Sequence, residues 1–257
     1  MVTTDEIETF YTKLAPLYHL IYSDWEKSII NQAKMIDTIF KDNWGDAIST
    51  VLDVSCGIGT QSLGLAGLGY QVTASDLSPD AVERARIEAN QRSLNILFSV
   101  ADMRQAYTHH AARFDAVISC DNSVPHLLTD SDILEAFMQF YQCVRPGGAC
   151  LISVRDYEKE ERTGQKLVPH GIREENGIRY LVFQVWDFHG EVYDVSLYFV
   201  EDRGEEECMT RVMRSKYYAV GIKKLMALLE EAGFSDVKRA DGNFFQPIII
   251  GTKKAST

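Results

Sequence analysis

The sequence feature that most constrains the fold is the ten-residue segment Val-Leu-Asp-Val-Ser-Cys-Gly-Ile-Gly-Thr at residues 51–60. It begins as a short apolar run that contains Asp53, and Gly57 and Gly59 then interrupt the pattern. Residues 61–70 carry apolar side chains at helical spacing. A strand, a glycine turn and a helix in this order are typical of a nucleotide site at the carboxyl end of a parallel strand. The segment therefore predicts an α/β protein with a ligand at this turn, where glycine lets the backbone approach closely.

The charge at this turn separates two kinds of ligand. A dinucleotide-binding turn would follow the pattern Gly-x-Gly-x-x-Gly, but the third glycine position here is Ser62. Asp53 would also face the pyrophosphate as a second anion. A carboxylate at a strand end is costly unless it is paired or faces a ligand. The sequence therefore favours a ligand with a cationic group, and a purely structural turn is the remaining alternative.

Strands and helices alternate along the chain as far as residue 157. This alternation predicts right-handed crossovers and a parallel sheet covered on both faces. The expected strands lie at about 49–54, 70–75, 96–100, 114–119 and 149–154, and the main helices at about 25–40, 78–91 and 131–143. The same pattern resumes with a helix at 220–232 and strands near 236–240 and 246–251.

The pattern changes after Tyr157. Residues 158–178 are polar and have no helical period, and the segments 179–188, 191–200 and 208–218 alternate like strands. We expect an antiparallel sheet inserted over the carboxyl edge of the main sheet. The predicted division is an N-terminal helical lid at 1–44, an α/β core at 45–157, the insert at 158–218, and completion of the core at 219–257.

Composition limits the class of partner. The chain has 257 residues, of which 46% are hydrophobic, as expected for one α/β domain with a small appendage. The net charge of −11 and the absence of a basic cluster disfavour nucleic acid and anionic membranes as partners. The N-terminal residues lack a signal-peptide core, and no apolar run has transmembrane length. We expect a cytoplasmic protein that acts on a small molecule, with a homo-oligomer left open.

The five cysteines are scattered along the chain and show neither a Cys-x-x-Cys pair nor Cys/His spacing suited to a metal, at positions 56, 120, 143, 150 and 208. They are expected to be buried free thiols in a reducing compartment. No metal site is predicted.

Residues 51–60 resemble motif I of the class I S-adenosylmethionine (SAM)-dependent methyltransferases, and the resemblance covers about residues 45–155. It implies a doubly wound, mostly parallel seven-stranded sheet. Asp76 ends the second strand, 17 residues after Gly59, where a carboxylate can accept both ribose hydroxyls. The resemblance gives Asp102 the adenine amino group and places Asn122 beside the sulfur. The predicted cofactor-binding residues are Asp53, Cys56, Gly57, Gly59, Asp76, Leu77, Asp102, Met103 and Cys120.

A narrower resemblance concerns the acceptor side. Residues 121–128 (Asp-Asn-Ser-Val-Pro-His-Leu-Leu) and 144–157 (ending Val-Arg-Asp-Tyr) are similar to segments of the glycine N-methyltransferase family. In that family the arginine that corresponds to Arg155 binds the carboxylate of glycine. Two positions depart from the family pattern, because Asp121 replaces a glycine and Asp156 replaces an asparagine.

The position of Arg155 supports the same role on physical grounds. It follows the fifth strand at the ligand-binding edge of the predicted sheet, where a guanidinium requires an anionic partner. A small carboxylate held by two hydrogen bonds is one such partner. A salt bridge to Asp156 or Glu158 is the alternative. The predicted catalytic residues are Asn122, Arg155, Tyr22 and Tyr218.

His126 has two interpretations, a general base or a hydrogen-bonded structural histidine. Methyl transfer to a neutral amine needs little acid–base catalysis, because orientation alone can supply about 7–11 kcal/mol of the barrier. The sequence therefore predicts no obligatory base.

The predicted function is SAM-dependent methylation of a small molecule, with S-adenosylhomocysteine as product. The acceptor favoured by the resemblance is the amine of glycine or of a similar small amino acid or amine, and a larger amine with an extra cationic group could use Asp121. The alternatives are O- or C-methylation of another metabolite and a non-catalytic SAM-binding protein.

Overall fold

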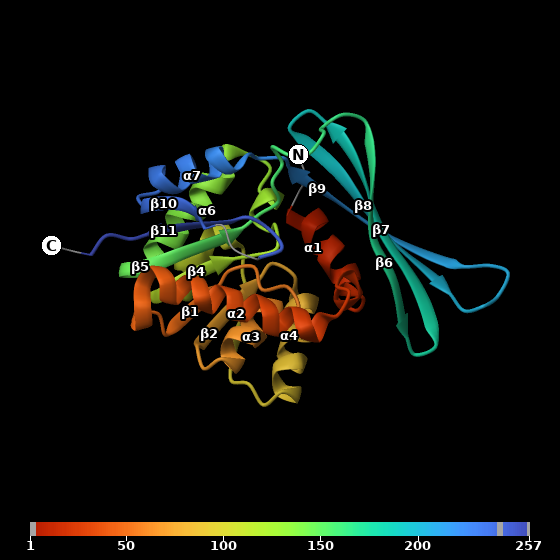
Figure 1. Cartoon of the computed structure of the whole chain (residues 1–257), viewed down its shortest axis with the longest axis horizontal. Coiled ribbons are helices and arrows are strands. Elements are labelled where there is room, and N and C mark those ends of the chain that lie inside the picture. Colours follow the sequence, from red (N-terminus) through yellow and green to blue (C-terminus); the bar gives the residue numbers. More distant parts are fainter. Residues whose placement is uncertain (1–3, 241–243, 256–257) are drawn as a thin grey trace.

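The core sheet consists of short apolar strands, and a computed structural model describes residues 4–240 and 244–255 of the chain (Figure 1). Its strand order is β10-β11-β5-β4-β1-β2-β3. Neighbours among β1 to β5 run parallel, whereas β11 is antiparallel to both β5 and β10. The predicted seven-stranded, mostly parallel sheet is thereby confirmed. Its strands are β1 (Thr50–Asp53), β2 (Gln71–Asp76), β3 (Leu97–Val100), β4 (Phe114–Ser119), β5 (Val144–Ser153), β10 (Ser235–Ala240) and β11 (Ile248–Thr252).

Helices cover both faces of this sheet because successive strand residues point to opposite sides. Val51 packs with Ile36 and Phe40 on one face, whereas Leu52 packs with Phe137 and other residues on the opposite face. Buried apolar side chains fill both interfaces, which is the arrangement of a doubly wound fold. The helices are α2 (Trp25–Trp44), α3 (Thr60–Gly67), α4 (Pro79–Gln91), α5 (Ala106–His110), α6 (Asp130–Cys143) and α7 (Ile222–Glu231), with 3-10 turns η2 (Gly45–Ala47), η3 (Met103–Gln105) and η4 (Val124–His126).

The carboxyl ends of the parallel strands lie side by side and deliver the predicted site segments to one edge. Val54 N donates to the carbonyl of Ile118 at 3.1 Å, and Asn122 N donates to the carbonyl of Ser153 at 3.0 Å. The loop after β1 is therefore tied to β4, and the loop after β4 to β5, by backbone hydrogen bonds.

The insert is a separate sheet of four antiparallel strands, β6 (Gln165–Glu175), β7 (Ile178–His189), β8 (Val192–Asp202) and β9 (Met209–Tyr218). The sequence predicted three of them and missed β6. Pro169 and Gly171 flank a register shift in β6, which breaks the period-two pattern. Because β6 is also an edge strand, its polar residues are tolerated, and the segment therefore resembles a loop in sequence. The predicted domain boundaries themselves remain predictions.

The N-terminal helix α1 (Thr4–Leu14) and the 3-10 turn η1 (Tyr18–Ile21) lie between the core and the insert (Figure 1). Phe10 and Leu14 pack in one apolar cluster with Tyr180, Leu197 and Phe199 of the insert. The turn is also joined to β6 by polar contacts, since His19 Nε2 lies 2.9 Å from Glu175 Oε1. The N-terminal segment and the insert therefore cover the strand ends together.

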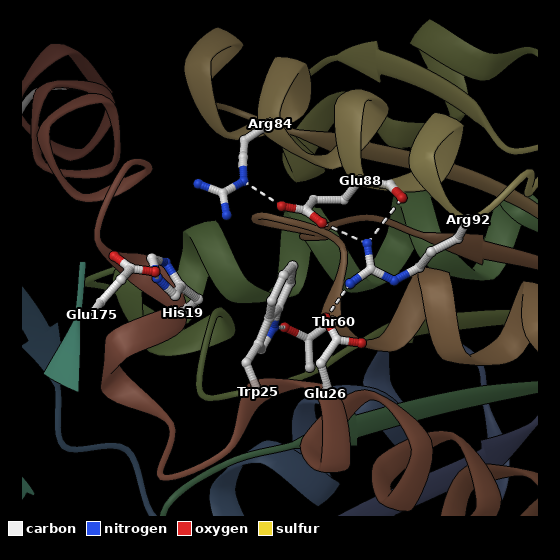
Figure 2. Close-up of polar contacts among 8 residues, drawn as sticks. All are labelled: His19, Trp25, Glu26, Thr60, Arg84, Glu88, Arg92 and Glu175. Carbon is white, nitrogen blue, oxygen red and sulfur yellow. Dashed lines mark hydrogen bonds and ion pairs between the residues drawn. The ribbon is translucent and has the colours of Figure 1, made fainter. Parts of the chain in front are cut away.

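The start of α2 fixes the other end of this segment to the core (Figure 2). Trp25 Nε1 donates to Thr60 Oγ1 at 2.8 Å. The indole ring lies near two guanidinium groups, 6.0 Å from Arg84 and 5.5 Å from Arg92. Both arginines are paired with Glu88, which holds them in place.

The structure also bears on two expectations from the sequence, the burial of the cysteines and the lack of a membrane-spanning segment. Cys56, Cys120, Cys143 and Cys150 are buried as predicted, whereas Cys208 is exposed, because it lies outside β9 in the loop that precedes it. Within the described ranges, no helix is both long and apolar enough to span a bilayer.

Candidate active site

Two neighbouring cavities occupy the carboxyl edge of the core sheet. The inner cavity, of about 600 Å³, lies against the loops after β1, β2 and β3. The outer cavity, of about 1890 Å³ including its open mouth, lies under the insert and the N-terminal segment. Tyr11 and Tyr18 line both cavities, so they mark the junction between them.

The inner cavity brings together five of the nine predicted cofactor-binding residues, Gly57, Asp76, Leu77, Asp102 and Met103. The other four do not line it, namely Asp53, Cys56, Gly59 and Cys120.

The glycine turn is shaped by left-handed backbone at Gly57 and Gly59, with φ values of 52° and 94°. Gly57 N donates to Asp76 Oδ2 at 2.8 Å. A Cβ atom at Gly57 would lie 3.2 Å from the Tyr18 ring, and Gly59 occupies the N-cap position of α3. Glycine is thus required for the turn at both positions, but only Gly57 faces the cavity.

Asp76 is nearly buried, and burial raises the pKa of its carboxyl. It accepts hydrogen bonds from Gly57 N and, at 3.0 Å, from Ser78 N. These backbone donors fix the carboxylate at the cavity wall, and its remaining lone pairs are available to ligand hydroxyls.

The surroundings of Asp53 differ from the expectation that its carboxylate faces a cationic ligand. It is buried, does not line either cavity, and accepts from Ser62 Oγ at 2.7 Å and Ser55 N at 3.2 Å. Burial raises its pKa to about 7. Asp53 therefore holds the turn together, and Ser62, which occupies the third glycine position of the dinucleotide pattern, supplies the hydroxyl.

Asp102 lines the inner cavity but is also engaged within the chain. Its carboxylate pairs with Arg104, whose Nη2 lies 2.5 Å from Oδ2. It also accepts from Arg104 N at 2.9 Å. The pair orients Asp102 at the start of η3, beside Met103.

Asn122 is buried and does not line either cavity. Its side-chain Nδ2 donates to Tyr157 Oη at 2.8 Å, and its Oδ1 accepts from Arg155 N at 3.0 Å. Both halves of the Asn122 amide thus position the loop that carries Arg155, and a place for Asn122 beside the sulfur stays a prediction.

Arg155 lines the outer cavity and is surrounded by aromatic rings. Its Nη1 donates to Tyr193 Oη at 3.1 Å, and the guanidinium carbon lies 4.9 Å from the Trp186 ring and 5.5 Å from the Tyr217 ring. Among the residues that the structure describes, no carboxylate lies within 4 Å of it. Asp156 pairs instead with Arg239 at 3.3 Å.

The two tyrosines that were predicted to be catalytic lie in different surroundings. Tyr22 lines the outer cavity and donates to Asp121 Oδ2 at 2.8 Å. Tyr218 does not line it, because its hydroxyl donates to Asp130 at 2.8 Å on the opposite side of β9. Side chains alternate along a strand, so it is Tyr217 that faces the cavity.

His126 lines the inner cavity, and the sequence left open whether it is a general base or a structural histidine. Its Nε2 lies 2.7 Å from Tyr11 Oη, its Nδ1 lies 3.3 Å from Ser215 Oγ, and its ring packs against Tyr217. Burial lowers its pKa to about 3. The neutral, hydrogen-bonded imidazole matches the structural interpretation.

The main residue that sequence reasoning missed is Tyr11, whereas Tyr18, Tyr193 and Tyr217 are among the aromatic residues that the sequence offers as pocket-forming side chains. The apolar period of residues 7–17 predicts an amphipathic helix. It does not say what that helix covers, because its contacts are distant in sequence, such as that of Tyr11 with His126, 115 positions apart. No local signal marks Tyr11 as ligand-facing.

Comparison with known proteins assigns the class. Residues 51–148 match the family described as "Methyltransferase domain". The match covers residues 51–148 alone, and together with the sheet order and the strand-end site it supports the predicted class, a class I methyltransferase with SAM as cofactor.

Individual relatives are similar to this chain over less than half of its length. The chain is 36% identical over 104 residues to a putative methyltransferase, YqeM, of Bacillus subtilis, covering 40% of this chain and 41% of that protein. It is 33% identical over 110 residues to a glycine/sarcosine N-methyltransferase of Parasynechococcus marenigrum, covering 43% and 39%. The matches thus span about two fifths of these relatives.

The whole fold is similar to that of CalS10, an amino pentose methyltransferase from Micromonospora echinaspora. The TM-score is 0.76, with 18% identity, 88% of this chain and 92% of that chain covered. At this identity the likeness concerns the fold alone.

Proposed function

We propose that this protein methylates the amine of a small molecule that also carries a carboxylate, with SAM as methyl donor. Glycine is the smallest member of this substrate class. The observation that carries the proposal is Arg155, a guanidinium in the outer cavity that has no carboxylate partner among the described residues. A cation placed in this way favours an anionic ligand group.

The inner cavity suits the cofactor chemically. Asp76 offers carboxylate oxygens to vicinal hydroxyls, Asp102 offers an acceptor to an amino group, and the turn at Gly57 leaves room for a close approach. When bound, SAM supplies a methyl group on a positively charged sulfur.

The outer cavity suits acceptors larger than glycine. Its enclosed volume of about 750 Å³ lies in the upper part of the roughly 300–1,000 Å³ range of typical ligand pockets. A similarity to glycine/sarcosine N-methyltransferase and a fold like that of an amino pentose methyltransferase are both compatible with an amine acceptor. The room beside the inner cavity supports catalysis over a purely cofactor-binding role.

The residues of this chain contribute mainly orientation. Arg155 fixes the acceptor, and Tyr11 and Tyr18 line the passage through which its nitrogen reaches the methyl group. The nitrogen lone pair forms the new N–C bond while the C–S bond breaks and its electrons remain on sulfur. The product amine then loses one proton. Because His126 is neutral and already hydrogen-bonded, no step is assigned to it as an acid.

The first prediction concerns the cofactor. Replacing Asp76 by alanine should weaken S-adenosylhomocysteine binding by roughly 1.5–3 kcal/mol, the range for a hydrogen-bonded charged group. Titration calorimetry measures the change. Asp80→Ala, on the exposed face of α4, is the matched control and should bind normally. Equal affinities of wild type and Asp76→Ala would contradict the ribose role.

A methylation screen across amino acids, amines, phenols and amine-free carboxylates tests the proposed function, with S-adenosylhomocysteine release as readout. Turnover restricted to acceptors with both an amine and a carboxylate supports it. Turnover of phenols or carbon acids alone would assign O- or C-methylation instead. Cofactor binding without turnover of any acceptor would indicate a binding protein.

A further inference from the structure

Asp121 is a carboxylate at the wall of the outer cavity with no cationic partner. It follows β4 and is partly buried. Within residues 4–240 and 244–255, no Lys, Arg or His nitrogen lies within 4 Å of it. Its neighbour two positions on, Ser123, lines the inner cavity. A group bound by Asp121 would therefore lie beside the passage to the cofactor.

A one-way chain of hydrogen bonds ends on Asp121. Trp25 Nε1 donates to Thr60 Oγ1 at 2.8 Å, Thr60 Oγ1 donates to Tyr22 Oη at 3.4 Å, and Tyr22 Oη donates to Asp121 Oδ2 at 2.8 Å. An indole N–H can only donate and an ionised carboxylate can only accept, so both ends of the chain agree with this direction. The Arg84 guanidinium lies 6.0 Å from the Trp25 ring (Figure 2). Asp121 is the acceptor at the end of the chain.

The second carboxylate oxygen is held from the other side. Ser153 Oγ accepts from Asp121 N at 2.8 Å and donates to Gln246 Oε1 at 3.3 Å. Gln246 Nε2 then donates to Asp121 Oδ1 at 3.4 Å. Both oxygens are oriented by neutral donors, and a carboxylate retains further lone pairs for a ligand.

The backbone of Asp121 has an uncommon conformation. Its φ is 56°, and that of Asn122 is 64°. Left-handed backbone favours glycine, and a side chain there persists when the surroundings hold it, often at a functional site. Burial raises the pKa of Asp121, against the opposing effects of Tyr22, Arg155 and Gln246, so an approaching cation would favour its ionised form.

We propose that Asp121 binds the amine of the acceptor, so that the substrate arrives as a zwitterion held between Asp121 and Arg155, and its ammonium releases one proton to solvent before the freed lone pair attacks the methyl group. Both residues line the outer cavity, yet no ion pair joins them, which leaves room for a ligand between the two charges. The amine is held at the cofactor side and the carboxylate lies in the aromatic cage of Arg155. The proposal rests on the proposed function, and it adds the group that selects amines.

The test measures recognition without methyl transfer. Calorimetry is performed with the full chain saturated with S-adenosylhomocysteine and three probes, phenylalanine, phenethylamine and 3-phenylpropionate. Wild type should bind phenylalanine best. In Asp121→Asn, the preference for phenylalanine over 3-phenylpropionate should fall about tenfold or more, as expected for loss of a charge-assisted hydrogen bond. Its preference for phenylalanine over phenethylamine, which reports on Arg155, should change little.

Two further variants separate binding from structure. Asp121→Gly also removes the carboxylate, and glycine accepts a φ of 56°, but Tyr22 and Gln246 lose their acceptor, so this variant should lose the amine preference with a modest loss of thermal stability. Asp156→Asn removes a neighbouring carboxylate that is already paired with Arg239 and Lys159, and should keep the preference.

Several outcomes would overturn the proposal. They are a wild type with no preference for the amine-bearing probe, an unchanged preference in Asp121→Asn, and an unchanged preference in a folded Asp121→Gly. Methyl transfer to an amine-free acceptor together with intact cofactor binding would reject both this proposal and the amine acceptor. Amine methylation with an unchanged Asp121→Asn preference would reject this proposal alone.

Discussion

Replacing Arg155 by alanine should lower kcat/KM for a carboxylate-bearing acceptor by roughly 30-fold or more. This corresponds to the 2–5 kcal/mol lost when one partner of a desolvated charge pair is removed. The guanidinium lies between Trp186 and Tyr217 and is bonded to Tyr193, so it is already oriented before the acceptor binds. Cofactor affinity should be nearly unchanged, because Arg155 does not line the inner cavity.

The conservative variant sharpens this prediction. Arg155→Lys should recover little activity, since an ammonium cannot reproduce the planar fork or its stacking on the rings. Lys159→Ala serves as control, because Lys159 is an exposed cation at the rim of the same cavity, and its effect should be smaller. Steady-state kinetics with the best acceptor from the screen, together with calorimetry of S-adenosylhomocysteine, separates the two effects. Unchanged turnover in Arg155→Ala, or a best acceptor without an anion, would reject the carboxylate role.

The second large effect is the contribution of His126 to stability at low pH. Burial lowers its pKa from 6.5 to about 3, with Arg155 acting in the same direction. As the pH falls below 6.5 the unfolded state takes up the proton first, so stability is lost progressively from pH 6.5 down to about 3. One pKa unit is about 1.4 kcal/mol, so His126 alone should cost about 2–3 kcal/mol by pH 4.5.

Denaturant unfolding at pH 7 and pH 4.5 measures this contribution. His126→Gln keeps a polar side chain near Tyr11 and Ser215 but does not titrate, so its loss of stability between the two pH values should be smaller by about 2–3 kcal/mol. His110, whose pKa burial lowers to about 4, adds to the loss in both proteins. His189→Gln, at an exposed position at the end of β7, is the control. Equal losses in wild type and His126→Gln would show that His126 is not buried in its neutral form.

The core of the fold and part of the site could be predicted because their signals are local. Gly57, Asp76 and Asp102 each stand where a strand ends, and parallel strands bring their carboxyl ends to one edge whatever else the chain does. The period of the apolar residues then distinguishes helices from strands. The class of cofactor follows from the acids and the glycine turn together.

Other predicted site residues lie away from the cavities where a local pattern has more than one three-dimensional outcome. Asp53 has the sequence position of a ligand-facing acid, but the helix after the turn presents Ser62 to it. Tyr217 and Tyr218 are neighbours of the same residue type, and the register of β9 on β8 decides which one faces the cavity.

The sequence by itself determined the α/β core, the edge at which ligands bind and the candidacy of Arg155. Only the tertiary structure decided that Tyr11 and Tyr18 join the two cavities and that the hydrogen-bond chain from Trp25 ends on Asp121. The physical reason is distance along the chain. Strand order and apolar period are properties of short segments, whereas these contacts join residues from the N-terminal segment to loops that follow it by many tens of positions, and packing alone brings them together.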